Sequence, residues 1–401
     1  MPPANRSRLF AASCVALIVT AMSFAIRGGT MGEIGARFTL RNEALGWIDG
    51  AAFWGFTLAM VVGGPLCDIV GMKRVAGAAF VCHLAGLLVT IFAQGFWSLY
   101  AGTLLIGIGN GSVEAACNPL IATMYPEEKT KRLNRFHVWF PGGNVIGGLV
   151  AYAMSNMNFT AFTHYGSWRL KTAVMLVPLA VYGWMFLGQN LPRTERVQSG
   201  VSTEAMFKEC LRPLFLLLLV CMAMTACTEL GPNQWIPNIL TASAGVSGIL
   251  VFVWINGLMA VGRQFAGPVV HRLAPGGMLL ASAIIAAVGV WCLSVATGGA
   301  ATFAAATVFA VGVCYFWPTM IGFISERCPR TGAVGLALMG GTGMLAVNFV
   351  LPYMGHIYDT EGGPAALRAV GVLPIILVFV FGALWLRDRA RGGYQAEKLG
   401  S

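Results

Sequence analysis

The chain has 401 residues and a net charge of +10; 57% of its residues are hydrophobic and only 10% are charged. Soluble domains carry about 25% charged residues, so this composition excludes a water-soluble protein, which could not bury so much apolar surface. The charge does not indicate a nucleic-acid-binding protein either, because the basic residues mark short loops and form no patch interleaved with aromatic residues. We therefore expect the lipid bilayer to be the solvent, and no nucleic acid to be a partner.

Twelve apolar segments follow one another along the chain, each close to the roughly 20 residues that a transmembrane helix needs. They are centred near Ile18, Thr57, Leu84, Leu105, Gly147, Pro178, Val220, Leu258, Ile284, Ala310, Ala346 and Phe379. We expect an all-α membrane protein with twelve transmembrane helices. The longest polar stretch falls after the sixth segment, so we divide the chain into a six-helix half (1–190), a linker (191–211), a second six-helix half (212–390) and a tail (391–401).

Lys and Arg are distributed unevenly over the loops between these segments. Of the 26 basic residues, nineteen fall in one alternate set of loops and the termini, while Arg27 and Arg263 lie inside apolar segments. The remaining five fall in the opposite loops: Arg37, Arg41, Arg169, Lys171 and Arg368. Because cytoplasmic loops carry the excess of Lys and Arg, we expect the linker and both termini to be cytoplasmic, in a bacterial inner (plasma) membrane.

The two halves resemble each other at three places. Gly64-Pro65 matches 267–268, Asn118-Pro119 matches 317–318, and Gly142-Gly143 matches 340–341, at offsets of 203, 199 and 198 residues. Similar offsets predict two six-helix pseudo-repeats of the same orientation. Transporters built from such repeats bind their substrate between the halves, near the bilayer midplane.

The loop after the second segment carries a glycine-rich charged motif. Gly64, Asp68, Gly71, Lys73 and Arg74 fall at the spacing of the G-x-x-x-D-x-x-G-x-[RK]-[RK] signature, and the motif resembles that of the major facilitator superfamily. In that family the cluster latches the inner gate, so the resemblance implies a gating role for the acidic and two basic residues. An ordinary basic loop would account for the basic residues, but not for the glycine spacing.

Glu114 lies within the fourth apolar segment, eleven residues before Tyr125. At 1.5 Å per residue this is about 16 Å from the inner end of the helix, close to the midplane. An ionised carboxylate there costs several kcal/mol, so Glu114 should be protonated, paired or wetted by a cavity. A buried acid of this kind can carry a proton. The alternatives are a static ion pair with Arg27 and a hydrogen bond that packs helices.

A second resemblance begins at the same place. Glu114-Ala-Ala-Cys-Asn118-Pro119, followed by 132–134 (Arg-Leu-Asn), resembles the E-x-A-x-N-P and R-L-N motifs of the fucose:proton symporter family. Trp317-Pro-Thr-Met in the tenth segment and Glu229 to Ile236 in the seventh are also similar to that family. The resemblance implies proton-coupled transport of a sugar. The family also has an acidic residue in its first helix, where this chain has only Arg27, so sodium coupling stays open; we expect Arg27 to pair with Asp49.

The seventh and eighth segments contain two further charged residues. Glu229 precedes Gly231-Pro232, which we expect to break the helix and to expose backbone groups to a substrate cavity. Glu229 is therefore a candidate for substrate or ion contact, or a gate residue near the outer end. Arg263 precedes the second Gly-Pro pair, and this position favours an inner gate or a packing role over substrate binding.

Amide and aromatic side chains suit a sugar, because amides bind hydroxyl groups and aromatic faces cover CH surfaces. Singly, such residues more often hold helices together. Lone histidines such as His83 and His137 are weaker candidates, since a nearby carbonyl usually satisfies them. The candidates in this class are Asn118, Trp139, Asn144, Gln234, Trp235, Asn256, Trp317 and Asn348.

These observations together predict a monomeric secondary transporter that rocks two halves and carries a small polar solute, a sugar or similar polyol, with protons. The alternatives are a uniporter or exporter of an organic anion, with Arg27 as the counter-charge, and an efflux pump for lipids or drugs. An enzyme is not expected, because the sequence has no His and Cys ligand cluster, no G-x-S-x-G and no H-E-x-x-H. For the same reason we expect no metal and no cofactor.

Overall fold

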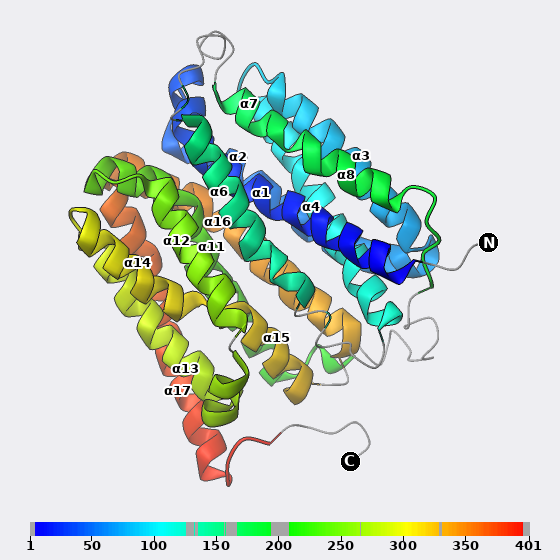
Figure 1. Ribbon diagram of the computed structural model, residues 1–401. Coiled ribbons are helices and arrows are strands. Elements are labelled where there is room, and N and C mark those ends of the chain that lie inside the picture. The colour runs from blue at the N-terminus through cyan, green and yellow to red at the C-terminus, as the bar shows by residue number, and fades with distance from the viewer. Residues whose placement is uncertain are drawn as a thin grey trace. The chain divides into compact units, whose positions relative to one another are not determined.

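The computed structural model describes residues 5–125, 132, 135–155, 157, 167–193, 208–264, 266–328 and 331–395, and these residues form helices and short turns without a strand. The prediction of an all-α protein is confirmed. The chain divides into two compact units, residues 1–200 and 201–401 (Figure 1). This boundary falls inside the predicted linker.

The helices of the first unit whose bounds the structure describes follow one another along the chain. They are α1 (Arg6–Phe38), α2 (Asn42–Ile69), α3 (Met72–Ile91), α4 (Phe96–Met124), α6 (Trp139–Ser155), α7 (Ser167–Val174) and α8 (Leu176–Phe186). The last two follow each other almost directly, so they make one interrupted span (Figure 1). Helices α2 and α3 both pack on α4, and α1 packs on α6. Glycine permits the closest approach, since a Cβ on Gly107 of α4 would lie 2.1 Å from the Ala52 carbonyl oxygen of α2.

The second unit is described in the same way. Its helices are α11 (Pro213–Ala244), α12 (Gly248–Gln264), α13 (Ala266–Val295), α14 (Gly299–Val313), α15 (Phe316–Arg327), α16 (Gly332–Glu361) and α17 (Gly363–Ala390). Helix α13 contains a kink at Ala274, where φ is 53° and ψ is 163°. The residues before the kink belong to the eighth predicted segment and those after it to the ninth. Helices α14 and α15 make the tenth, interrupted at Cys314 and Tyr315.

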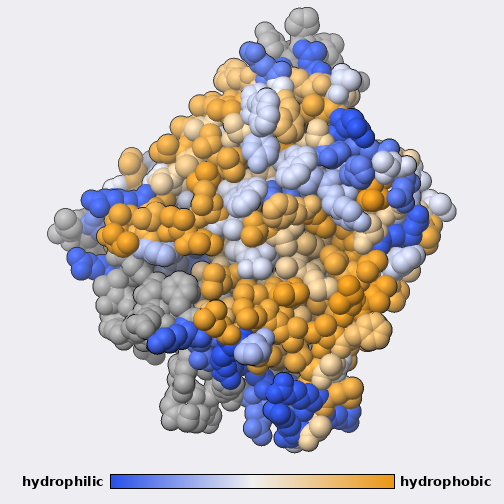
Figure 2. All heavy atoms as spheres, turned by 180° about the vertical axis from the view of Figure 1, so that it is seen from behind, coloured by the Kyte–Doolittle hydropathy of each residue, from blue (hydrophilic) through white to orange (hydrophobic). Residues whose placement is uncertain are grey.

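Each of the twelve predicted centres lies in a helix, and among the described residues eight helices are long and apolar enough to cross a membrane. The three repeated dipeptides lie in matching elements: near the end of α2 and before the α13 kink, in α4 and α15, and in α6 and α16. The prediction of twelve helices in two pseudo-repeats is therefore confirmed. Large hydrophobic side chains such as Val81 of α3 and Phe379 of the last helix are exposed, as helices facing lipid require, and Figure 2 shows many hydrophobic residues on one face.

The predicted break of the seventh segment at Gly231-Pro232 is wrong. Helix α11 runs without interruption through Pro232 and Pro237. Gly231 serves close packing instead, because a Cβ there would lie 3.1 Å from the sulfur of Met354 on α16. A proline inside a membrane helix is tolerated where neighbouring helices and polar side chains compensate for the lost hydrogen bond.

Candidate functional site

Helix α4 presents a polar stripe in an otherwise apolar environment. The Asn118 side-chain nitrogen donates to Glu114 Oε2 at 3.1 Å, and the Asn118 oxygen lies 3.0 Å from His137 Nε2. Because an amide oxygen only accepts, His137 Nε2 must carry the hydrogen of that bond. Glu114 and Asn118 are both half-buried and lie one turn apart, so they share a helix face. The spacing of four residues predicts this contact, whereas His137 could not be predicted, because it lies beyond the connection that follows α4.

Asn110 extends this stripe by one more turn, into the interior of the first unit. His83 Nε2 donates to Asn110 Oδ1 at 2.9 Å, and Asn110 donates to Ser23 Oγ at 3.0 Å. On the other side of the ring, His83 Nδ1 lies 2.9 Å from the Tyr182 hydroxyl. His83 is therefore satisfied as expected, but by side chains of α4 and α8 and not by a carbonyl. Asn110 is not among the residues predicted from the sequence, although polar residues at 110, 114 and 118 repeat every fourth position.

Arg27 and Asp49 form an ion pair between α1 and α2, which confirms that prediction. Their side chains are 9% and 1% exposed. The guanidinium also lies over the ring of Phe24, 4.9 Å from its centroid. Among the described residues the carboxylate partner of Arg27 is thus Asp49, and the alternative of a static pair between Arg27 and Glu114 is not supported.

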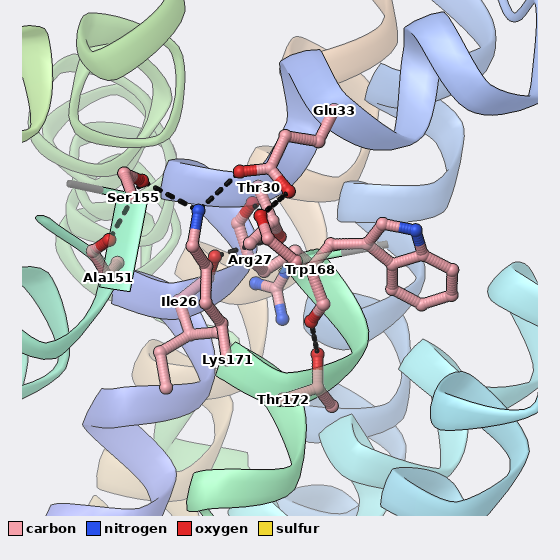
Figure 3. A network of polar contacts seen from close by, with 10 residues as sticks. Ile26, Arg27, Thr30, Glu33, Ala151, Ser155, Trp168, Lys171 and Thr172 are labelled. Carbon is pink, nitrogen blue, oxygen red and sulfur yellow. Dashed lines mark hydrogen bonds and ion pairs between the residues drawn. The ribbon is translucent and has the colours of Figure 1, made fainter. Parts of the chain in front are cut away.

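A second ionic cluster lies near the end of α1. Arg169 and Lys171 were expected in a loop, but both lie in α7, so that prediction is wrong. The side chain of Lys171 is fully buried. Its ammonium group forms an ion pair with Glu33 and a hydrogen bond of 2.7 Å to Ser155 Oγ, while Ser167 donates to the other Glu33 oxygen at 2.5 Å. Figure 3 shows the ammonium between Ser155 and Glu33. This cluster joins α1, α6 and α7, and we assign it to the stability of the first unit.

The motif after α2 is only partly described. Gly71 adopts a φ of 89°, a conformation that glycine adopts without strain, so the turn between α2 and α3 explains its place in the motif. Lys73 and Arg74 begin α3 with exposed side chains, and the Arg74 guanidinium reaches the Val70 carbonyl at 3.5 Å. The side chain of Asp68 lies outside the described residues, as do 133–134 of the Arg-Leu-Asn motif. The gating role of the motif stays a prediction.

Glu229 and Arg263 come together in the second unit, which the sequence analysis did not predict. Arg263 Nη2 donates to Glu229 Oε1 at 3.0 Å, and Arg263 Nε donates to the Cys314 carbonyl at 3.0 Å. Glu229 is 5% exposed and lies near the middle of α11, not near an end. Its second oxygen, Oε2, is buried and has no hydrogen-bond partner among the described residues. The contact places Arg263 at the same level as this carboxylate.

The remaining candidates of the second unit differ in burial. Trp235 is fully buried and donates from its indole nitrogen to the Leu351 carbonyl at 3.2 Å, so it holds α11 against α16. Asn256 donates to the Phe252 carbonyl of its own helix at 3.0 Å, and Asn348 is completely buried.

Trp317 is half-buried beside Gly343, and the buried Gln234 keeps Oε1 without a hydrogen-bond partner in the described part of the chain. The last two are the better placed for a ligand.

Asn144 and Trp139 lie on α6 of the first unit. Asn144 is 6% exposed, whereas Trp139 is exposed near the start of the helix. Within the described ranges no group of three or more His, Cys, Asp or Glu side chains is placed to bind a metal ion.

Comparison with known proteins gives the family. The sequence profile of the Major Facilitator Superfamily matches residues 13–347. A vacuolar membrane amino acid uptake transporter, fnx2 of Schizosaccharomyces pombe, is 24% identical over 262 residues, which are 63% of this chain and 43% of that protein. The chain thus covers less than two thirds of the length of the first curated relatives that it matches.

A relative and a solved structure match over most of their length. The hexuronate transporter of Bacillus subtilis is 24% identical over 375 residues, which are 84% of this chain and 87% of that protein. The fucose:proton symporter FucP of Escherichia coli has a similar fold, with a TM-score of 0.66 and 16% identity over 94% of this chain and 98% of that one. This chain is a multi-pass integral membrane protein and belongs to the Major Facilitator Superfamily.

Proposed function

We propose that this protein is a secondary active transporter that carries a small polar solute, a sugar or similar polyol, together with protons, and that Glu114 is the proton carrier. The observation that carries the proposal is the environment of Glu114. In the described part of the chain its carboxylate is bound by a neutral amide, Asn118, and by no cation. A half-buried carboxylate without a cation has little to stabilise its charge in a membrane, and this supports the assignment of the transported proton to Glu114.

The charges of the two units favour a neutral solute over an anion. The two arginines inside apolar segments already have carboxylate partners: Arg27 has Asp49, and Arg263 has Glu229. An anionic solute would have to compete with these carboxylates for the guanidinium groups. A neutral polyol needs only hydrogen-bonding groups and an aromatic face; Asn118 offers an amide in the first unit, and Gln234 and Trp317 offer an amide and an aromatic face in the second.

The names of the relatives leave the substrate class open at 24% identity, because one is an amino acid transporter and another a hexuronate transporter. The direct test is counterflow in proteoliposomes with labelled neutral sugars, polyols, amino acids and organic anions. We expect exchange of a neutral sugar or polyol. Exchange of organic anions alone would replace this proposal with the organic-anion alternative.

The coupling role of Glu114 is tested by comparing exchange with gradient-driven uptake in the same vesicles. Glu114→Gln imitates the protonated carboxyl group, so exchange should persist while accumulation driven by a proton gradient disappears. The control is Glu361→Gln, at the exposed end of α16, which should retain both activities. Accumulation that persists in Glu114→Gln under a proton gradient alone would remove this residue from the mechanism, and dependence on a sodium gradient would indicate sodium coupling.

The orientation is part of the same proposal: both termini and the linker at 191–211 face the cytoplasm of a bacterial cell. The excess of Lys and Arg in one set of loops supports it. Ser199→Cys in a cysteine-free background should react with an impermeant thiol reagent only after the cells are opened. Labelling of intact cells from outside would reverse the orientation.

A further inference from the structure

The tenth span is interrupted at a position that its own sequence explains. Helix α14 ends at Val313 and α15 begins at Phe316. In a continuous helix the Cys314 carbonyl would accept a hydrogen bond from the backbone nitrogen of residue 318. That residue is Pro318, which has no N–H, so the Cys314 carbonyl loses its donor within the helix. A buried carbonyl in this situation needs a donor from elsewhere.

Arg263 supplies that donor from the neighbouring helix α12. Its Nε donates to the Cys314 carbonyl at 3.0 Å. Two more contacts join the same stretch of α12 to the interruption: the Tyr315 hydroxyl donates to the Gly262 carbonyl at 3.0 Å, and the Cys314 thiol lies 3.6 Å from the Met259 carbonyl. Arg263 is the charged member of this set, so its hydrogen bond should be the strongest of the three.

The guanidinium of Arg263 has a second partner on a third helix. Nη2 donates to Glu229 Oε1 of α11 at 3.0 Å, and the Arg263 side chain is 18% exposed. Glu229 therefore fixes the position from which Arg263 reaches the Cys314 carbonyl. The other oxygen of Glu229, buried and without a hydrogen-bond partner among the described residues, is free to accept a proton or a hydroxyl hydrogen. Either event would weaken the hold of Glu229 on the guanidinium.

We propose that Arg263 is a positioning residue that couples Glu229 to the proline-induced interruption of the tenth span. When Glu229 is ionised and binds no solute, Arg263 bridges Glu229 of α11 and the Cys314 carbonyl. The arrangement of α14 and α15 is then fixed. When Glu229 is protonated or engaged by a solute, the guanidinium is released and the carbonyl loses its donor, so α15 can move relative to α14. Arg263 and the Cys314 thiol are the charged or titratable groups that lie next to Glu229 in the described structure.

The proposal goes beyond the proposed function, because it concerns the helix that moves and not the ion or the solute. The test of this proposal needs no substrate. The role of Arg263 can therefore be disproved while proton-coupled sugar transport is correct, and proton-coupled sugar transport can be disproved while the role of Arg263 is correct. The Cys314 thiol is a reporter at the interruption itself, since it is 2% exposed and should react with N-ethylmaleimide only when the interruption opens. The rate is measured in purified protein whose other nine cysteines are replaced.

The decisive experiment is a double-mutant cycle with Arg263→Lys and Pro318→Ala. Lysine keeps the charge but lacks the planar fork of donors that serves two acceptors at once. Arg263→Lys should raise the labelling rate roughly 5-fold or more, the factor expected for a buried carbonyl that loses its donor. Pro318→Ala restores the backbone N–H for the Cys314 carbonyl, so in this background Arg263→Lys should have no effect. Glu229→Gln should raise the rate when Pro318 is present.

Two outcomes would overturn the proposal. If Arg263→Lys leaves the labelling rate of Cys314 unchanged, Arg263 does not hold the interruption. If it raises the rate equally in the presence of Pro318 and in the Pro318→Ala background, its effect does not pass through the orphaned carbonyl. Arg272→Lys, the same exchange at an exposed position, is the control and should leave the rate unchanged. Elution of each variant as a single monodisperse peak excludes unfolding as the cause of faster labelling.

Discussion

The two pseudo-repeats have a proline at matching positions, but different groups replace the backbone donor that this proline lacks. In the first repeat Pro119 removes the donor for the Ala115 carbonyl, and the Cys67 thiol of α2 replaces it at 3.4 Å. In the second repeat Pro318 removes the donor for the Cys314 carbonyl, and the Arg263 guanidinium replaces it. Helix α4 remains continuous, whereas the tenth span divides into α14 and α15. The same local rule thus leaves one helix continuous and divides the other, and the group that replaces the lost donor is a neutral thiol in the first repeat and a charged guanidinium in the second.

The carboxylates differ in the same way. Glu114 lies on the proline-containing helix of the first repeat and is bound by an amide. Glu229 lies on α11, whereas Pro318, the counterpart of Pro119, lies on α15. The carboxylate of Glu229 is bound by Arg263, which also reaches the Cys314 carbonyl. A carboxylate held by neutral groups can exchange a proton without breaking an ion pair, whereas a carboxylate in an ion pair changes its partner when it does so. We therefore expect a change at Glu229, and not one at Glu114, to affect the interruption of the tenth span.

The largest expected effect is on folding stability at Glu229. Glu229→Leu leaves the Arg263 charge largely buried without a carboxylate, which should cost about 3–5 kcal/mol of the free energy of unfolding. The matching change, Glu114→Leu, removes one hydrogen bond from a half-buried amide and should cost about 1 kcal/mol. Denaturant titration in detergent measures both. Equal costs at the two positions would show that the carboxylates do not differ as the contacts indicate.

The next effect concerns the neutral network that holds α4 in the first repeat. His83→Leu removes the partner of both Asn110 and Tyr182 in a fully buried place, and should cost about 2–3 kcal/mol of unfolding free energy. Gly109→Ala should also destabilise the protein, because a Cβ at this position would lie 2.3 Å from the His83 ring. The exposed His356 is the control, and His356→Leu should change stability by less than about 0.5 kcal/mol. If His83→Leu lowers the free energy of unfolding no more than His356→Leu does, the neutral network does not stabilise the first repeat.

A smaller effect is expected at the motif between α2 and α3. The second repeat has His271 where the first has Asp68, at the offset of 203 residues, so only the first repeat carries the acidic group of the gating signature. Asp68→Asn should shift the population of inward-open and outward-open states by roughly 5-fold, while substrate affinity at a locked conformation stays the same. His271→Asn should not shift it. Cysteine accessibility on the two membrane sides measures the population, and equal shifts in both variants would contradict a latch confined to the first repeat.

Much of the fold could be predicted from the sequence, because helix number and length depend on local apolar length alone. Most contacts between helices could not, because an apolar membrane helix is hydrophobic on all sides and its sequence does not fix which face meets a neighbour. The ion pair of Arg27 and Asp49 is an exception, because opposite charges in consecutive apolar segments need a partner. The Glu114 and Asn118 contact was within reach, since it follows from a spacing of four residues on one helix. The Glu229 and Arg263 pair was not, since it joins two helices across 34 residues. The break expected at Pro232 was wrong because proline removes one backbone hydrogen bond, and the loss of one bond need not end a helix.

The smallest effect tests the replacement donor of the first repeat. The Cys67 thiol is a weak donor to the Ala115 carbonyl, so Cys67→Ala should lower the free energy of unfolding by no more than about 1 kcal/mol. In Pro119→Ala the helix supplies its own donor to that carbonyl, and the cost of Cys67→Ala should fall to the cost of the lost sulfur packing. Denaturant titration of the four proteins gives the coupling between the two positions. A coupling as large as that between Arg263 and Pro318 in the labelling experiment would contradict the distinction between the repeats, because a thiol would then hold its carbonyl as firmly as a guanidinium does. A small coupling, with α4 continuous in every variant, would place the movable joint in the second repeat alone.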